Sequence, residues 1–255
     1  MQRGSAACFF SLSVLLTAVF LAGAQPSLDA DEIVRRADAK MRGETNYSEM
    51  TMTVVRPDWS RTVSLKGWEK ARTYSLTVIT APSKEKGQAF LKRGVEMWNW
   101  VPSIDRVIKL PPSMMSQSWM GSDFTNDDLI KESSIVKDYS HTLSGRDTID
   151  GRDCWKVTLT PLPNAAVVWG KVVAWITVQE DIEVKEQYFD EDGALVNTER
   201  FSDIQMMGGR EIPARMEMTP AAKPGCKTVL VVNTIWFDKP IADDFFSLQN
   251  LKRVR

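Results

Sequence analysis

The feature that most constrains the fold is an alternation of apolar and polar residues that begins near residue 50. Met50, Met52 and Val54 alternate with Thr51 and Thr53. Every second side chain of a strand lies on the same face, so this spacing predicts half-buried β-strands. Short connections with turn residues separate the strand segments, as in an antiparallel meander. The predicted strands lie at 50–55, 62–66, 73–78, 88–92, 95–101, 106–110, 154–160, 172–178, 183–189, 195–201, 212–218 and 228–237.

This pattern predicts a mainly β (α+β) fold of about eleven strands, and an antiparallel sheet of that size must curl. One helix precedes the strands. Asp29 is suited to cap its N-terminus, Ile33, Ala37 and Met41 recur at every fourth position, and Gly43 ends it. The apolar stripe of this helix is expected to cover part of the sheet.

The start of the chain has the three zones of a secretory signal peptide. Arg3 precedes an apolar run at 6–21, and Ala22, Gly23 and Ala24 follow it. The apolar run is short of the ~20 residues that a membrane span requires. We expect residues 1–24 to be a cleaved signal peptide and residues 25–255 to form a single periplasmic domain without an anchor of its own.

Charge and cysteine content narrow the classes of function. The formal net charge is −1, and acidic and basic residues are interleaved, so nucleic acid is not an expected partner. Cleavage would leave Cys154 and Cys226 in an oxidising compartment. They could form a disulfide or remain two separate thiols, and the sequence leaves both alternatives open.

No enzymatic or metal site is evident in the sequence. His141 is the only histidine, and no nucleophile motif such as Gly-x-Ser-x-Gly accompanies it, which favours a surface or strand-edge histidine. One histidine and two distant cysteines do not make a zinc site, and the calcium-loop pattern is missing. We therefore expect no enzyme, no metal and no cofactor.

The segment 111–138 follows neither the strand nor the helix period. Its apolar side chains are interspersed with serine and glutamine, a mixture that suits a lid better than a core strand, and methionine adapts to variable apolar shapes. A short helix is expected near 126–131, capped by Thr125 or Asn126, and a last helical turn near 243–248 is expected to dock two aromatic rings on the sheet. The residues expected to line or close a pocket are Met114, Met115, Trp119, Met120 and Phe124, with Trp98 and Trp100 as pocket wall or core.

The same segment carries a family resemblance that covers the chain from the first helix to its end. Together with Met97-Trp98-Asn99-Trp100-Val101-Pro102 and Ala166-Val167-Val168-Trp169-Gly170-Lys171, the run from Leu110 to Leu129 resembles the LolA-like outer-membrane lipoprotein-sorting proteins. The resemblance implies an incomplete barrel with an apolar concave side, closed by short helices and a lid loop. Members of the superfamily carry lipoproteins or lipids across the periplasm, and this branch is similar to those found beside exporters of the RND class.

The expected function is therefore that of a periplasmic carrier or acceptor, which binds a lipid or lipoprotein acyl chain for transfer toward the outer membrane and contacts membrane surfaces transiently. The alternative is a non-enzymatic interaction or sensor domain that docks on an RND-type exporter or a signalling partner.

Overall fold

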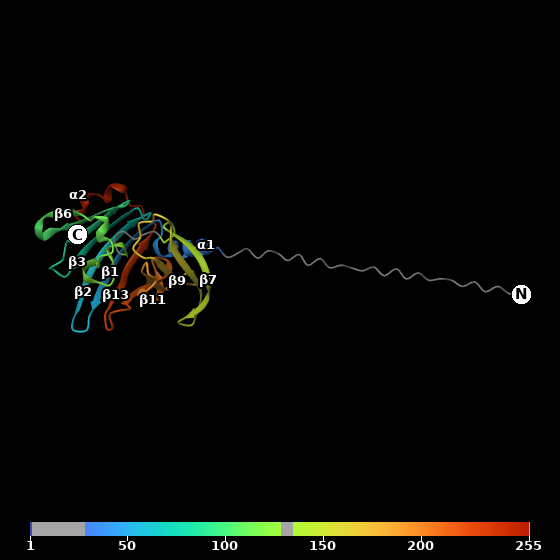
Figure 1. Ribbon diagram of the computed structural model, residues 1–255. Coiled ribbons are helices and arrows are strands. Elements are labelled where there is room, and N and C mark those ends of the chain that lie inside the picture. Colours follow the sequence, from blue (N-terminus) through green and yellow to red (C-terminus); the bar gives the residue numbers. More distant parts are fainter. Residues whose placement is uncertain (2–28, 129–134, 255) are drawn as a thin grey trace.

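The computed structural model describes residues 29–128 and 135–254, together with Met1. The predicted signal peptide and the second half of the predicted helix at 126–131 lie outside these residues. Within the described part of the chain, no helix is long and apolar enough to cross a membrane. Figure 1 shows one curved sheet with a helix against one side of it and the C-terminal segment against another.

The predicted first helix is confirmed as α1 (Ala30–Arg42). The Asp29 carboxylate accepts a hydrogen bond of 3.0 Å from the backbone N–H of Asp31, which satisfies a donor at the helix N-terminus. Gly43 ends the helix with a φ of +65°, in the left-handed region that glycine adopts without strain. Ile33, Val34 and Ala37 are buried, so the apolar stripe faces the sheet as expected.

Thirteen strands form a single sheet in which every neighbouring pair is antiparallel. The first six are β1 (Thr45–Val55), β2 (Ser60–Lys70), β3 (Tyr74–Ala81), β4 (Ala89–Arg93), β5 (Glu96–Val101) and β6 (Arg106–Lys109). The others are β7 (Tyr139–Ile149), β8 (Arg152–Pro161), β9 (Lys171–Thr177), β10 (Glu183–Phe189), β11 (Leu195–Met207), β12 (Arg210–Pro220) and β13 (Lys227–Phe237).

The strand order explains the position of the irregular segment. The order is β6-β5-β4-β3-β2-β1-β13-β12-β11-β10-β9-β8-β7, so β1 pairs with β13 and the two edges are β6 and β7. These edge strands follow one another in the sequence but lie at opposite edges of the sheet. The segment 110–138, called the insert below, must therefore run from one edge to the other. It contains the short helices η2 (Pro112–Met114) and η3 (Trp119–Gly121).

The predicted fold class is confirmed, with thirteen strands where about eleven were expected. The strand without a counterpart among the predicted segments is β7. It is an edge strand whose residues are mostly exposed or half-buried, and its register with β8 shifts between Leu143 and Gly145. The alternating pattern of β7 is confined to its first half, where Tyr139 is buried and Leu143 is half-buried against the helix cluster. From Ser144 to Thr148 the strand is exposed, so the pattern is too short to indicate the whole strand.

The sheet buries apolar side chains on both faces. On the inner face, the helix cluster packs around α1 and the insert cluster packs under the insert. The helix cluster includes Ile33, Val34, Ala37, Phe124, Val157, Leu159 and Trp169, and the insert cluster includes Met52, Val63, Phe90, Met97, Met115, Trp119 and Leu230. On the outer face of β3 to β5, the C-terminal segment with η5 (Asp243–Phe245) and α2 (Leu248–Leu251) covers Leu76 and Leu91, and Phe246 is fully buried there. The expected docking of aromatic rings is confirmed.

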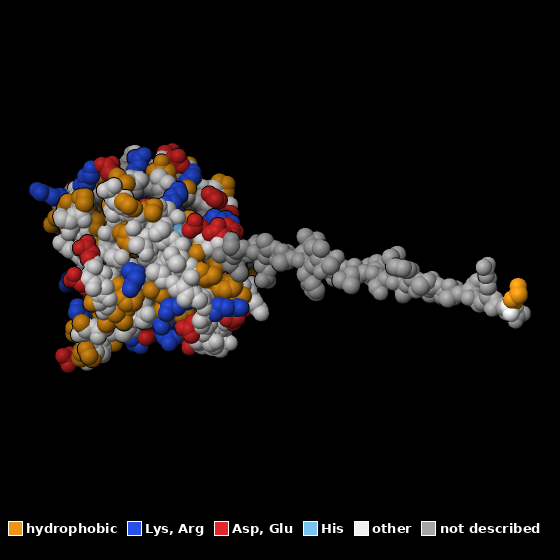
Figure 2. All heavy atoms as spheres, turned by 45° about the vertical axis from the view of Figure 1, so that its right-hand side comes forward, with side chains coloured by type: hydrophobic (Ala, Val, Ile, Leu, Met, Phe, Trp, Pro, Cys, Tyr) orange, Lys and Arg blue, Asp and Glu red, His pale blue; other side chains and the backbone are white. Residues whose placement is uncertain are grey.

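Lys, Arg, Asp and Glu side chains are interspersed over the face shown in Figure 2, as the near-zero net charge predicts. The two cysteines of the described residues are free thiols. Cys154 is buried on the outer face of β8, and Cys226 is half-buried just before β13. The structure thus favours the second of the two alternatives left open by the sequence.

Candidate functional site

A cavity of about 260 Å³ lies on the inner face of the sheet. Side chains from α1, from the insert and from strands as far apart as β3 and β7 line it, so the sheet curves around it. Its volume lies just below the ~300–1,000 Å³ of typical ligand pockets. The apolar side chains that line it are Met41, Met50, Leu65, Trp119, Phe124, Ile135, Trp169, Val172, Phe201, Met216, Leu230, Val232 and Ile235.

The structure brings the five apolar residues predicted in the insert to the inner face. Met115 and Trp119 are buried in the insert cluster, and Met114 and Met120 pack against it. The Trp119 ring lies 5.4 Å from the Phe90 ring between centroids. Phe124 belongs to the helix cluster. Trp119 and Phe124 line the cavity, whereas the three methionines support the insert from the side.

Trp98 and Trp100 lie elsewhere. Both belong to the outer-face cluster that the C-terminal segment covers, with Trp100 buried and Trp98 half-buried. Met97, their neighbour in β5, points to the inner face and the insert cluster. Alternation places the two tryptophans on one face but does not say which face is the concave one. They are therefore not among the residues that line the cavity.

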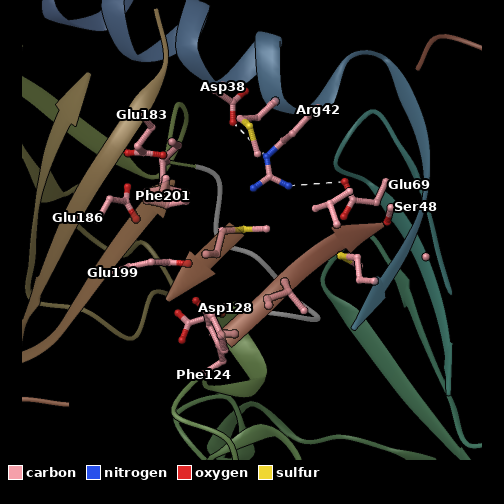
Figure 3. Close-up of a pocket in the computed structure, with 18 of the residues that line it drawn as sticks. Asp38, Arg42, Ser48, Glu69, Phe124, Asp128, Glu183, Glu186, Glu199 and Phe201 are labelled. Atoms are coloured by element: carbon pink, nitrogen blue, oxygen red, sulfur yellow. Dashed lines mark hydrogen bonds and ion pairs between the residues drawn. The ribbon is translucent and has the colours of Figure 1, made fainter. Parts of the chain in front are cut away.

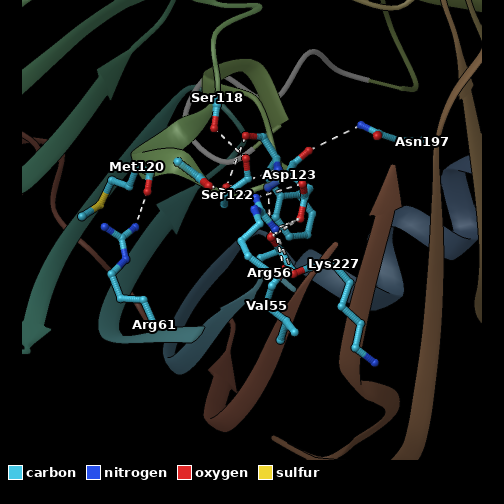
Figure 4. A network of polar contacts seen from close by, with 12 residues as sticks. Val55, Arg56, Arg61, Ser118, Met120, Ser122, Asp123, Asn197 and Lys227 are labelled. Carbon is cyan, nitrogen blue, oxygen red and sulfur yellow. Dashed lines mark hydrogen bonds and ion pairs between the residues drawn. The ribbon is translucent and has the colours of Figure 1, made fainter. Parts of the chain in front are cut away.

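A network of polar contacts fixes the insert to the sheet (Figure 4). The Arg56 guanidinium donates to both carboxylate oxygens of Asp123, at 2.9 and 3.0 Å, and to the carbonyl oxygen of Gly121 at 3.0 Å. The Thr228 hydroxyl donates to the Asp123 carboxylate at 2.7 Å. The Asp123 side chain is only 3% exposed, so the insert is held by a nearly buried, bidentate ion pair.

The start of the predicted helix at 126–131 is also defined. The Thr125 hydroxyl accepts from the backbone N–H of Asp128 at 3.1 Å, and the Asp128 carboxylate accepts from the backbone N–H of Thr125 at 2.7 Å. These reciprocal bonds confirm Thr125 as the cap and orient Asp128. The second Asp128 oxygen accepts a bond of 3.0 Å from the indole N–H of Trp169.

One side of the cavity carries four carboxyl groups, which we call the acidic wall: Asp128, Glu183, Glu186 and Glu199. Figure 3 shows the three glutamates together on one side, with Asp128 coming from the insert. Glu186 and Glu199 are direct cross-strand partners in β10 and β11. The Tyr188 hydroxyl contacts both, with 2.8 Å to Glu199. A hydroxyl has one proton to donate, so the second contact is a hydrogen bond only if that carboxyl group carries a proton.

The pKa shifts of three acids in the wall favour protonated carboxyl groups. Burial raises the pKa of Glu183 and of Glu199 well above the usual range, and the neighbouring Glu186 carboxylate adds to both shifts. Burial also raises the pKa of Asp128, against the hydrogen bonds that it accepts. The pKa of Tyr188 is raised for the same reason, so its hydroxyl stays protonated. In the folded protein, Asp128, Glu183 and Glu199 therefore favour their protonated forms.

On the opposite side of the cavity, two arginines form ion pairs with two carboxylates. Arg42 lies 3.2 Å from the Asp38 carboxylate and 3.5 Å from the Glu69 carboxylate, and Arg72 also pairs with Asp38. Burial lowers the pKa of Arg72 to about 10, so it remains charged at neutral pH. In Figure 3, Arg42 reaches down from α1 between the acidic wall and Glu69.

The acidic wall was not predicted from the sequence. Glu183 and Glu186 are three residues apart, which places them on opposite faces of a regular strand. In the structure, the register between β9 and β10 shifts between Glu183 and Lys185, and this irregularity brings both glutamates to the inner face. The one available signal was the predicted hairpin at 183–201, in which Glu186 and Glu199 fall opposite one another.

The remaining candidates do not join the site. His141 lies in the edge strand β7, where its Nδ1 is 2.6 Å from an Asp31 carboxylate oxygen and its Nε2 is 2.6 Å from the carbonyl oxygen of Ile135. It does not line the cavity. Among residues 29–128 and 135–254, no cluster of His, Cys, Asp and Glu has a geometry that could hold a metal ion.

Comparisons with known proteins identify a family model and solved structures that are similar to this chain. A family model described as an uncharacterized protein matches residues 71–253. A search of curated proteins gives no match. A crystal structure of a DUF1329 family protein from Desulfovibrio piger is 25% identical, with a TM-score of 0.79, over 87% of this chain and 97% of that chain.

Two further crystal structures share the fold. A LolA superfamily protein from Nitrosomonas europaea has a TM-score of 0.77 at 24% identity, over 88% of this chain and 100% of that chain. A candidate outer membrane lipoprotein-sorting protein domain from Vibrio parahaemolyticus has a TM-score of 0.77 at 22% identity, over 88% and 98% of the two chains. These similarities confirm the expected resemblance. The chain therefore belongs to the family that the matching model describes, and its fold is that of the LolA-like proteins.

Proposed function

We propose that this protein is a non-enzymatic periplasmic carrier or acceptor that binds the acyl chain of a lipid or lipoprotein for transfer toward the outer membrane. The observation that carries the proposal is the cavity on the inner face, which is lined largely by apolar side chains and bordered by the insert. The fold shared with a LolA superfamily protein and with a candidate lipoprotein-sorting domain supports it.

Burial of an acyl chain in such a site is favourable, but a carrier must also be able to release the chain. Each CH₂ group taken out of water contributes ~0.8 kcal/mol, so a chain of about twelve carbons contributes on the order of 10 kcal/mol before the costs of binding. Met114, Met115 and Met120 pack beside the cavity, and their unbranched side chains adapt to different neighbours. The insert can therefore repack when a chain enters or leaves.

A substitution that fills the cavity tests this function. Met216 lines the cavity, and Met206 is 69% exposed on the neighbouring strand β11. Met216→Trp should displace about two CH₂ groups of a bound chain and weaken binding of a fluorescent fatty-acid analogue about tenfold. Met206→Trp, with the same change of side chain outside the cavity, should bind as the wild type does. Equal binding by both variants would contradict the proposal.

Extraction of the native protein gives an independent test. Organic extraction of protein purified from its own periplasm, followed by mass spectrometry, should yield an acyl-chain lipid. An empty cavity, together with no binding of the fluorescent analogue, would overturn the carrier function. Recovery of an intact complex with a membrane exporter, without any lipid, would instead favour the docking domain that is the alternative function.

A further inference from the structure

The distribution of polar and apolar side chains in the cavity indicates the chemistry of the ligand's headgroup. A carrier for plain acyl chains needs apolar walls only, and buried carboxyl groups in such a site are costly. This cavity nevertheless has the acidic wall at one side and apolar side chains such as Leu65, Leu230 and Val232 elsewhere. A ligand that matches both parts is an amphiphile.

The acidic wall is built by elements that are distant in the sequence. Glu183 and Glu186 come from β10, Glu199 from β11 and Asp128 from the insert, and all four line the same cavity. The ion pairs found at the cavity belong to the other side, where Arg42 and Arg72 face Asp38 and Glu69. No Lys or Arg of the described residues forms an ion pair with the four carboxyl groups of the wall.

Two of the cavity's buried polar atoms, one in the acidic wall and one on a tryptophan of the insert, have no hydrogen-bond partner among the residues that the structure describes. One is Oε1 of Glu183, in the acidic wall. The other is the indole Nε1–H of Trp119, a residue from the insert that is 2% exposed and lines the cavity. Buried polar groups are nearly always paired in folded proteins, so an unpaired acceptor and an unpaired donor in one cavity point to a ligand that pairs with them.

We propose that the cavity selects an amphiphile with a positively charged amine headgroup, which the acidic wall of Asp128, Glu183, Glu186 and Glu199 binds while the apolar side takes the tail. This inference rests on the proposed carrier function and adds the chemical class of its ligand. An ammonium group donates up to three hydrogen bonds, and its positive charge favours the ionised form of the acids that it contacts, which then release their protons. The Trp119 N–H is then free to pair with an oxygen of the same headgroup.

Three compounds with the same tail separate the headgroup from the acyl chain: dodecylamine, dodecanol and dodecanoate. Their affinities for the full-length mature protein are measured by isothermal titration calorimetry at neutral pH, below the critical micelle concentration. The wild type should bind dodecylamine at least tenfold more tightly than dodecanol, as one charge-assisted hydrogen bond would give, and dodecanoate most weakly.

The variant Glu186→Gln/Glu199→Gln removes two ionisable groups from the wall without changing the size of the side chains. Its ratio of dodecylamine to dodecanol affinity should fall about tenfold, since the charge-assisted bonds are lost. The substitutions relieve the repulsion between directly opposed acids, so the variant is expected to fold, which circular dichroism checks. Glu211→Gln changes an exposed acid of β12 and should leave the ratio unaltered.

The outcomes distinguish this inference from the function on which it rests. If dodecanol and dodecanoate bind the wild type as tightly as dodecylamine, or if the double variant keeps the preference for the amine, the headgroup proposal is overturned and the carrier function stands. If none of the three compounds binds, the carrier function fails together with the inference.

Discussion

At the scale of single residues, Glu199 shows how burial in the cavity favours the protonated, neutral form of a carboxyl group. The burial of its side chain, and then the Glu186 carboxylate, raises its pKa in the folded protein, while Arg42 opposes the shift only weakly. Tyr188 donates to it, and Asp128 faces it from the insert. The folded protein thus binds a proton on this group more tightly than the unfolded chain does.

The raised pKa of Glu199 determines how the stability of the protein changes with pH. The stabilisation is fully present below the pKa of an unfolded glutamate, about 4.3, and is lost as the pH rises through the folded value. Glu199→Gln, which cannot ionise, should therefore gain stability relative to the wild type as the pH rises above about 4.3, by about 1.4 kcal/mol for each unit of the pKa shift. Urea unfolding at several pH values measures this.

The control for this experiment is Glu191→Gln, a change at an exposed glutamate in the turn after β10. Its stability should follow that of the wild type at every pH. A Glu199→Gln variant whose difference from the wild type does not change with pH would show that Glu199 titrates as an ordinary carboxyl group in the folded protein.

At the scale of elements, the insert depends on the ion pair between Arg56 and Asp123. Removal of one partner from a buried pair leaves an uncompensated charge and typically costs about 3–5 kcal/mol. Arg56→Ala should therefore destabilise the protein by about that amount in urea unfolding. Hydrogen exchange of the insert should rise more than that of β8 and β9, because the guanidinium bonds to Gly121 and Asp123 would be lost.

Arg106→Ala provides the matched control, since Arg106 is exposed in the edge strand β6. An exposed arginine of this kind should change stability by less than about 0.5 kcal/mol. Equal stability of the two variants would mean that the Arg56 ion pair does not hold the insert.

The same scale shows what the sequence could and could not predict. Helix α1 was predictable because its cap, its apolar stripe and Gly43 are all local signals. The alternating strands were predictable because one face of each is buried. The edge strand β7 and the acidic wall were not, because only the first half of β7 has a buried face and the position of Glu183 depends on an irregular register. Likewise, alternation pairs Trp98 with Trp100 but cannot assign them to the inner or the outer face.

At the scale of the whole molecule, the pairing of β1 with β13 joins two halves that are otherwise successions of hairpins. One half is β1 to β6 and the other is β7 to β13. The insert connects their outer edges, and the cavity takes side chains from both halves. This arrangement ties the two halves into one structure, and we therefore expect the predicted single domain to unfold in one step.

Two leucines of equal chemistry and burial test this cooperativity. Leu91 in β4 and Leu159 in β8 are both fully buried, one in each half. Each change to alanine should cost about 2–5 kcal/mol. Both should lower the midpoint of the same thermal transition, by about 2–4 °C for each kcal/mol in a protein of this size.

Leu195→Ala, at a leucine of β11 that is 38% exposed, should shift the midpoint far less than either buried substitution. Calorimetry and circular dichroism should give coincident transitions for all three variants. Two separate transitions, one sensitive only to Leu91→Ala and the other only to Leu159→Ala, would show that the halves unfold independently. The β1–β13 pairing would then be a contact between two domains, and the cavity would lie at a domain boundary that could open without unfolding either half.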